Sequence, residues 1–241
     1  MAIKGILFDL YGTLIDIETD ESMEEIYRGI SHYLNYHGSR LHRWEVQDRY
    51  YAIMRRQKAE RGEEFPEIDV EAIWSSFLTQ EGIGTPADRR TQATTLAQMY
   101  RGLSRKRLQL YPEVKRVLDE VRVAYRIALI SDAQPCYALP EIKFAGLDGY
   151  FDPLIISGHH GFRKPDPRLT KKALDALHLG PAEVIYVGND MYRDIHGARQ
   201  LGIKTIFVDS NQGDKCHEKT TPDYVAHRFE DVLSGVETLR A

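Results

Sequence analysis

The sequence predicts an α/β fold, with a Rossmann-like parallel sheet as its core and an inserted α-helical cap domain. Three observations support this prediction. Short unbroken apolar runs recur along the chain, as in strands that are buried on both faces. Segments with apolar residues at helical spacing lie between these runs, and strands that alternate with helices form parallel sheets. One long stretch, residues 17–103, interrupts the alternation with helical patterns alone.

The core elements follow in chain order. The first apolar run is short and ends at Asp9. The runs expected to be strands are Ile6–Phe8, Ile127–Ile130, Leu154–Ile156, Val184–Val187 and Thr205–Val208. Helices are expected at Pro112–Val123, Leu169–Leu177 and Asp194–Leu201, the first because its apolar residues form a stripe with a period near 3.6.

The interrupting stretch reads as four helices separated by glycine and proline. Their expected ranges are Glu24–Tyr36, Trp44–Arg61, Val70–Thr79 and Pro86–Tyr100. We therefore expect a core domain of residues 1–16 and 104–241 and a helical cap domain of residues 17–103. The cap should face the carboxyl ends of the strands, where open α/β sheets bind their ligands.

Composition narrows the classes of function. The 241 residues carry a formal net charge of −4, which disfavours nucleic acid and anionic membranes as partners. No apolar run approaches the roughly 20 residues that span a bilayer, and the first residues lack the plan of a signal peptide. Cys136 and Cys216 are far apart and read as free thiols of a reducing compartment. We expect a cytoplasmic protein, monomeric or homodimeric, that acts on a small molecule.

The first candidate site is Asp9, which ends the first strand and is followed by a turn containing Gly12. A carboxylate in a ring of backbone N–H groups can act as a nucleophile and form a covalent intermediate. On this segment alone, a simple turn-capping role for Asp9 is equally compatible with the pattern.

Three further strand ends or turns carry polar residues. Ser131 and Asp132 follow an apolar run, where a serine more often caps the next helix. Lys164 stands before a Pro-Asp-Pro turn, although a solvated lysine is the commoner fate. Asp190 and Asp194 are four residues apart at a strand-to-helix turn, a spacing at which two carboxylates can hold a hard cation.

The order and separation of these four motifs resemble the haloacid dehalogenase superfamily of hydrolases, over essentially the whole chain. The resemblance implies that Asp9 is the nucleophile and that Ser131 and Lys164 bind and neutralise the substrate's charged group, with Leu10 and Asp132 also in contact with substrate. In the phosphatases of that superfamily Mg²⁺ is held by the first and last motifs. The corresponding ligands here are Asp9, the Tyr11 carbonyl, Asp190 and, more distantly, Asp194.

Tyr11 departs from the phosphatase pattern, which has a second aspartate there to protonate the leaving group. A tyrosine with a pKa near ~10 is a poor general base at neutral pH, and the Tyr-Gly-Thr form resembles metal-independent 2-haloacid dehalogenases. Asp190 and Asp194 resemble the phosphatase form instead. We therefore predict a Mg²⁺-dependent phosphatase acting on a small phosphate ester, with a 2-haloacid dehalogenase or a catalytically silent binding protein as alternatives.

Overall fold

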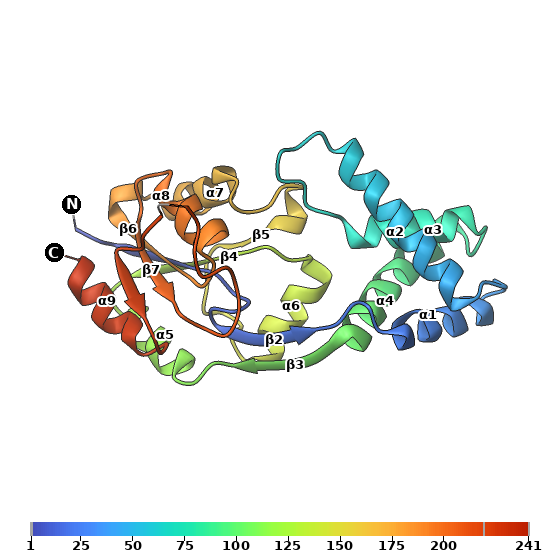
Figure 1. The fold of residues 1–241 in the computed structure, drawn as a ribbon, viewed down its shortest axis with the longest axis horizontal. Helices are drawn as coiled ribbons and strands as arrows, with labels where there is room; N and C mark the ends of the chain where they lie inside the picture. Colours follow the sequence, from blue (N-terminus) through green and yellow to red (C-terminus); the bar gives the residue numbers. More distant parts are fainter. Residues whose placement is uncertain (1, 219, 241) are drawn as a thin grey trace.

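The computed structural model describes residues 2–218 and 220–240 and contains a six-stranded, fully parallel sheet (Figure 1). The strand order across the sheet is β5-β4-β1-β6-β7-β8, which places β1 centrally. The strands are β1 (Gly5–Phe8), β4 (Arg126–Ser131), β5 (Leu154–Ile156), β6 (Val184–Gly188), β7 (Lys204–Val208) and β8 (Tyr224–Ala226). The predicted α/β class with a parallel sheet is confirmed.

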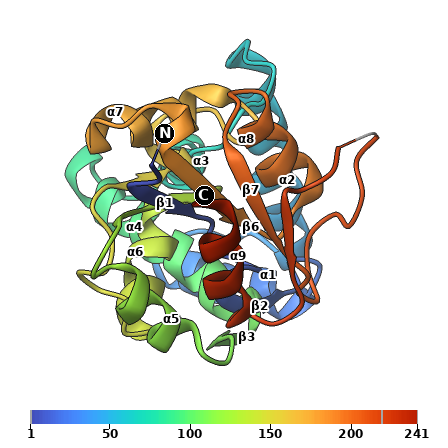
Figure 2. The same cartoon turned by 90° about the vertical axis from the view of Figure 1, so that its left-hand side faces the viewer.

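Helices cover both faces of this sheet (Figure 2). Successive side chains of a strand point to opposite faces, so Ile6 and Phe8 belong to one apolar core and Leu7 to another. The first core lies under α5 (Val114–Val121), α6 (Pro135–Phe144) and α9 (Asp231–Leu239), the second under α7 (Pro167–Leu177) and α8 (Gly197–Arg199). Burial on both sides explains why these strands are uninterrupted apolar runs.

A helical insertion, α1 to α4, lies between two antiparallel strands that lead away from the sheet, β2 (Ile15–Thr19) and β3 (Arg105–Leu110) (Figure 1). Its helices are α1 (Glu24–Tyr36), α2 (Arg43–Glu60), α3 (Val70–Gln80) and α4 (Pro86–Ser104). They pack around a core of their own that includes Tyr27, Trp74 and Tyr100. Asp69 caps α3 and Thr85 caps α4, as side-chain oxygens at helix N-termini commonly do.

The insertion touches the sheet domain a second time through the 61–69 loop. The Glu67 N–H donates to the Gly161 carbonyl at 3.0 Å, and the Arg163 N–H donates to Phe65 at 3.0 Å. The buried Glu67 carboxylate also accepts from the Ser157 hydroxyl at 2.6 Å. This contact fixes the insertion to the sheet domain independently of β2 and β3.

Several elements escaped the sequence patterns. Strands β2 and β3 alternate charged residues and pair through ion pairs such as Arg107 with Asp16, so they lack an apolar run. Helix α6 contains Pro140, a residue that ordinarily ends helices. The helix expected at 194–201 begins earlier, as a π-helical turn Met191–His196 followed by α8. None of the described helices is both long and apolar enough to cross a bilayer.

Candidate active site

Three charged side chains from different elements meet at the carboxyl edge of the sheet. Asp9 follows β1, Lys164 precedes α7, and Asp194 lies in the π-helical turn after β6. The Lys164 ammonium contacts Asp9 Oδ1 at 2.5 Å and Asp194 Oδ1 at 2.7 Å. All three side chains are buried. We call these residues, with Asp132 and Arg193 beside them, the Asp9 cluster.

The second oxygen of Asp9 is held by the turn that follows β1. The Thr13 hydroxyl lies 2.9 Å from Asp9 Oδ2 and 3.0 Å from Asn189 Oδ1. Gly188 lets Asp194 fold back against the end of β6, because a Cβ at Gly188 would stand 2.5 Å from the Asp194 Cβ. Both loops therefore come close enough to fix the orientation of Asp9.

Lys164 keeps its charge although it is buried. Burial alone would lower its pKa, but the carboxylates of Asp194 and Asp9 outweigh burial and hold the pKa of Lys164 well above its usual value. The cluster therefore places a permanent cation against the proposed nucleophile, where it can offset the charge of an approaching anion.

A small cavity of about 130 Å³ opens beside these residues. Its lining is almost entirely polar and comes from Asp9, Tyr11, Asp132, Lys164, Asn189, Arg193, Asp194, Gln212 and Gly213. No lining residue belongs to the helical insertion. The sheet domain alone thus supplies the polar groups that would meet a reacting anion.

The remaining predicted substrate contacts lie around this cavity without lining it. The Leu10 side chain is fully buried in the apolar core under α5 and α9, so a contact with substrate would fall to its backbone. Ser131 is also fully buried, and its hydroxyl has no hydrogen-bond partner among the described residues. That hydroxyl retains the capacity to bind a substrate oxygen.

Of the predicted magnesium ligands, Asp9, Tyr11 and Asp194 line the cavity and Asp190 does not. Asp190 is outside the cavity lining; one of its oxygens caps the π-helical turn and the other accepts from the Arg193 guanidinium at 2.8 and 2.9 Å. Asp194 is occupied by Lys164, Tyr186 and two backbone N–H groups. The described part of the chain holds no group of three or more His, Cys, Asp or Glu side chains placed to bind a metal. As arranged, these residues do not fit a magnesium ion.

Tyr11 belongs to a different set of contacts, which we call the Glu141 cluster: Tyr11, Arg101, Arg105 and Glu141. The Tyr11 hydroxyl donates to Glu141 in α6. Glu141 also accepts two hydrogen bonds from Arg101, at 2.9 and 3.0 Å, and one from Arg105 at 3.0 Å. Burial, reinforced by the Glu141 charge, raises the pKa of Tyr11 far above its usual value. The hydroxyl is therefore committed to Glu141 and has no acid–base capacity near neutral pH.

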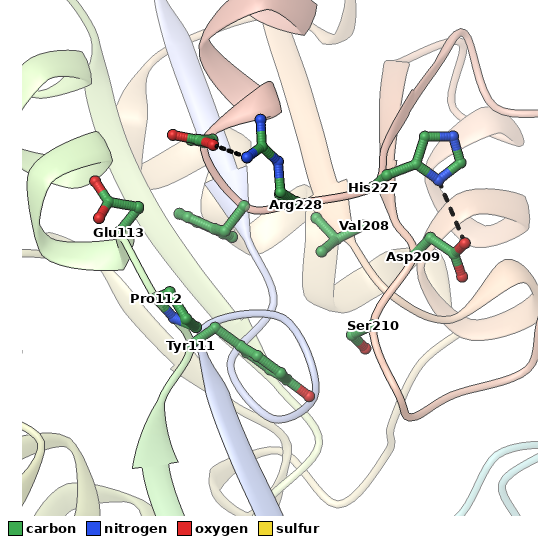
Figure 3. A pocket seen from close by; sticks show the side chains of 10 residues that line it. Tyr111, Pro112, Glu113, Val208, Asp209, Ser210, His227 and Arg228 are labelled. Atoms are coloured by element: carbon green, nitrogen blue, oxygen red, sulfur yellow. Dashed lines mark ion pairs between the residues drawn. The ribbon is translucent and has the colours of Figure 1, made fainter.

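A second and larger cavity of about 350 Å³ lies where β7 and β8 end (Figure 3). Several of its polar side chains are already in contact with one another: His227 lies 3.5 Å from Asp209, and Arg228 pairs with Glu230 at 2.8 Å. It contains none of the motif residues. The smaller polar cavity is the better candidate for chemistry.

Sequence reasoning missed Arg193, Asn189, Gln212 and Gly213 as lining residues. Arg193 follows Asp190 by three residues, a spacing at which opposite charges pair on a helix. The ion pair between these two side chains could therefore have been predicted from the sequence. Gln212 and Gly213 lie in the irregular loop after β7, and no pattern in the sequence marks them as residues of a site.

Known proteins resemble this chain in sequence and fold. The profile of a family described as haloacid dehalogenase-like hydrolase matches residues 3–202. A phosphoserine phosphatase of Thermus thermophilus is 38% identical over 140 residues, 58% of this chain and 54% of that protein. An (S)-2-haloacid dehalogenase of Pseudomonas sp. (strain YL) is 28% identical over 98% of this chain and 95% of its own length. The match spans about half the length of the phosphoserine phosphatase and of two glyceraldehyde 3-phosphate phosphatases of Pyrococcus species. A 2-haloacid dehalogenase structure from Pseudomonas syringae covers 99% of this chain and 100% of its own, with a TM-score of 0.73 and 21% identity.

Proposed function

The chain belongs to the haloacid dehalogenase-like hydrolases, and from that premise we propose that it hydrolyses small phosphate esters with Asp9 as a covalent nucleophile. The polar lining of the cavity carries this proposal. A phosphoryl group needs polar contacts on all its oxygens, whereas the carbon and halogen of a haloacid need apolar ones. Eight of the nine lining residues have polar side chains, and Lys164 and Arg193 supply positive charge.

The reaction has two steps in this proposal. An oxygen of Asp9 forms a bond to phosphorus while the bond to the ester oxygen breaks, and the bonding electrons leave on that oxygen. Water then attacks the aspartyl phosphate, which releases inorganic phosphate and restores Asp9. Lys164 touches the attacking carboxylate and offsets the repulsion between two anions. Ser131 has a free hydroxyl to donate to a phosphoryl oxygen.

Magnesium enters none of these steps. The carboxylates expected to hold it are paired with Lys164 and Arg193, so a metal ion would first have to displace a cation of the protein. The guanidinium that such an ion would displace from Asp190 belongs to Arg193.

The helical insertion is proposed to act as a cap that selects the part of the substrate beyond the phosphoryl group. It is anchored next to the cavity at two places, through Arg101 above the Tyr11 ring and through the 61–69 loop. Both attachments flank the cavity, so changes in the insertion should alter which esters are accepted.

A 2-haloacid dehalogenase is the second candidate, for a specific reason. Halide needs no proton when it leaves, and Tyr11, at the position of the usual proton donor, is committed to Glu141. The similarity to a 2-haloacid dehalogenase over nearly the full length of both chains also favours it.

One experiment separates the candidates. The purified protein is assayed for phosphate release from p-nitrophenyl phosphate and alkyl phosphates, with and without Mg²⁺, and for halide release from 2-chloropropionate. A phosphatase releases phosphate and passes through an acid-stable phosphoryl group on Asp9. Halide release without phosphate release would overturn the proposal in favour of the dehalogenase, and neither activity would favour a silent binding protein.

A further inference from the structure

Hydrolysis of an alkyl phosphate needs a proton donor for the departing alcohol, and Tyr11 is committed elsewhere. We propose that Asp132 is the general acid and base of this active site: it protonates the leaving oxygen and then activates the water that attacks the phosphorylated Asp9. This inference rests on the proposed phosphatase function.

The other titratable residues of the cavity lining are already engaged. Asp9 is the nucleophile, and Lys164 is an ammonium ion between two carboxylates. Both oxygens of Asp194 accept hydrogen bonds from the protein. Tyr11 donates to Glu141, and Arg193 is a permanent cation.

Asp132 differs from these residues because one of its oxygens is open. It follows β4 directly, and its Oδ1 accepts from the Lys164 backbone N–H at 2.9 Å, which fixes the carboxyl group. Its Oδ2 is buried and, within the described chain, has no hydrogen-bond partner; Arg193 Nη1 stands 3.9 Å away. The side chain is only 9% exposed. A buried polar atom left open beside a reaction cavity points to a ligand.

The surroundings also favour a carboxyl that can carry a proton. Burial raises the pKa of Asp132, although the positive charges of Lys164, Arg193 and Arg163 oppose this. Glu67 approaches from the 61–69 loop, and burial together with the charge of Asp132 raises the pKa of Glu67. A raised pKa brings a carboxyl closer to the operating pH, where general acids work best.

Atoms and protons balance through both steps. Protonated Asp132 gives its proton to the ester oxygen as the bond from phosphorus to that oxygen breaks, so the product is a neutral alcohol. The Asp132 carboxylate then takes a proton from water while the water oxygen bonds to phosphorus. Phosphate leaves, Asp9 is restored, and Asp132 is again protonated.

The test compares leaving groups in Asp132→Asn. Asparagine can still accept from the Lys164 N–H, so the loop should keep its conformation, and thermal unfolding verifies this. Rapid quench measures formation of the phosphorylated enzyme from p-nitrophenyl phosphate, whose leaving group needs no proton, and from an alkyl phosphate, whose leaving group does. We expect the alkyl rate to fall by roughly 10²–10⁴-fold, as for loss of a general acid. The aryl rate should stay within a few-fold of the wild type, with slow hydrolysis of the phosphorylated enzyme afterwards.

The matched control is Asp209→Asn, which removes a carboxylate at the end of β7, outside the site cavity, and should leave both rates unchanged. Asp132→Glu should recover part of the alkyl rate. Equal slowing of both substrates by Asp132→Asn would overturn the acid–base role, because loss of binding or of fold does not depend on the leaving group. Absence of phosphate release by the wild type would instead overturn the phosphatase proposal, and this inference with it.

Discussion

Two buried clusters of charged side chains meet at the segment after β1, which contributes Asp9 to one and Tyr11 to the other. They differ in how completely their polar atoms are hydrogen-bonded. In the Glu141 cluster the carboxylate accepts from Tyr11, Arg101 and Arg105. In the Asp9 cluster, Asp132 Oδ2 is left without a hydrogen-bond partner in the described chain. The first set joins α4, β3 and α6 and has no capacity for a ligand, whereas the second has capacity left.

The two clusters differ in whether a polar atom is left free to bind a ligand. An unbonded buried polar atom costs free energy, and a ligand that bonds to it would remove that cost. A cluster whose polar atoms are all hydrogen-bonded avoids this cost. It stabilises the fold and fixes the relative positions of the elements that it joins. Substitutions in the two clusters should therefore have opposite effects on activity and on stability.

The largest expected effect is on turnover in Asp9→Asn. The amide is not nucleophilic, so the rate should fall by about 10⁴-fold or more, while the free energy of unfolding changes little because Asp194 still pairs with Lys164. Steady-state kinetics and urea denaturation of the same preparation measure both. A residual rate within a few-fold of the wild type would refute covalent catalysis by Asp9.

Glu141→Gln should show the opposite pattern. Removing one partner of a buried ion pair typically costs 3–5 kcal/mol, and we expect about 3 kcal/mol, the lower end of that range, because Arg105 is partly exposed. Glu237→Gln, which loses only an exposed pair with Arg240, is the control and should stay within about 0.5 kcal/mol of the wild type. A loss of stability no larger than the control's would contradict the structural role of this cluster.

The stability loss in Glu141→Gln should also depend on pH. Burial alone would raise the pKa of Glu141, but hydrogen bonds and charge from Arg101 outweigh it and hold the pKa below its usual value of 4.5. A carboxyl with a depressed pKa contributes stability above that value and loses it as the pH falls through the folded-state pKa. The difference between wild type and variant should therefore narrow below pH 4.5 in urea denaturation curves.

Arg193→Gln tests whether Asp190 can bind Mg²⁺. Its guanidinium pairs with Asp190 and is about 39% exposed, so the pair is worth roughly 1 kcal/mol. Removing it should tighten Mg²⁺ binding by about fivefold, as measured by titration calorimetry, because Asp190 becomes available as a ligand. An unchanged affinity would show that any metal bound here does not use Asp190.

The smallest effect is expected for Tyr11→Phe. The variant keeps the ring and loses one donor to Glu141, which should cost about 1 kcal/mol of stability, and kcat should stay within about threefold of the wild type. A much larger fall in kcat, with a changed pH profile, would return an acid–base role to Tyr11.

The sequence predicted the sheet better than the connections. Five of the six sheet strands are apolar runs, and the four helices of the insertion show apolar residues at helical spacing with glycine and proline between them, so these elements were predicted to within a few residues. The short edge strand β8 was not predicted. The resemblance to the haloacid dehalogenase superfamily implied that Lys164 acts on the group that Asp9 attacks, and the two side chains are in contact.

Apart from the Asp190–Arg193 pair, which their spacing of three residues could have indicated, the pairing of the site side chains could not be predicted from the sequence patterns. Two carboxylates four residues apart suggested a shared cation, but the structure gives Asp190 to Arg193 and Asp194 to Lys164. The spacing of residues along the chain predicts which side chains are close together. Which of them form ion pairs or hydrogen bonds depends also on residues that are distant in sequence, such as Glu141, which lies in a helix that was not predicted. The commitment of Tyr11 to Glu141 was unreadable for the same reason.

The 61–69 loop limits how the helical insertion can move. An insertion carried on β2 and β3 alone could pivot freely, but in Figure 1 the loop and these two strands lie on opposite sides of the molecule. A rigid-body rotation of the insertion relative to the sheet domain must first break the hydrogen bonds at Phe65 and Glu67. It must also expose the buried Glu67 carboxyl group to water. Wide opening therefore becomes an activated event with a steep temperature dependence. For a substrate too large to enter the closed form, release of this loop would then limit the rate of entry.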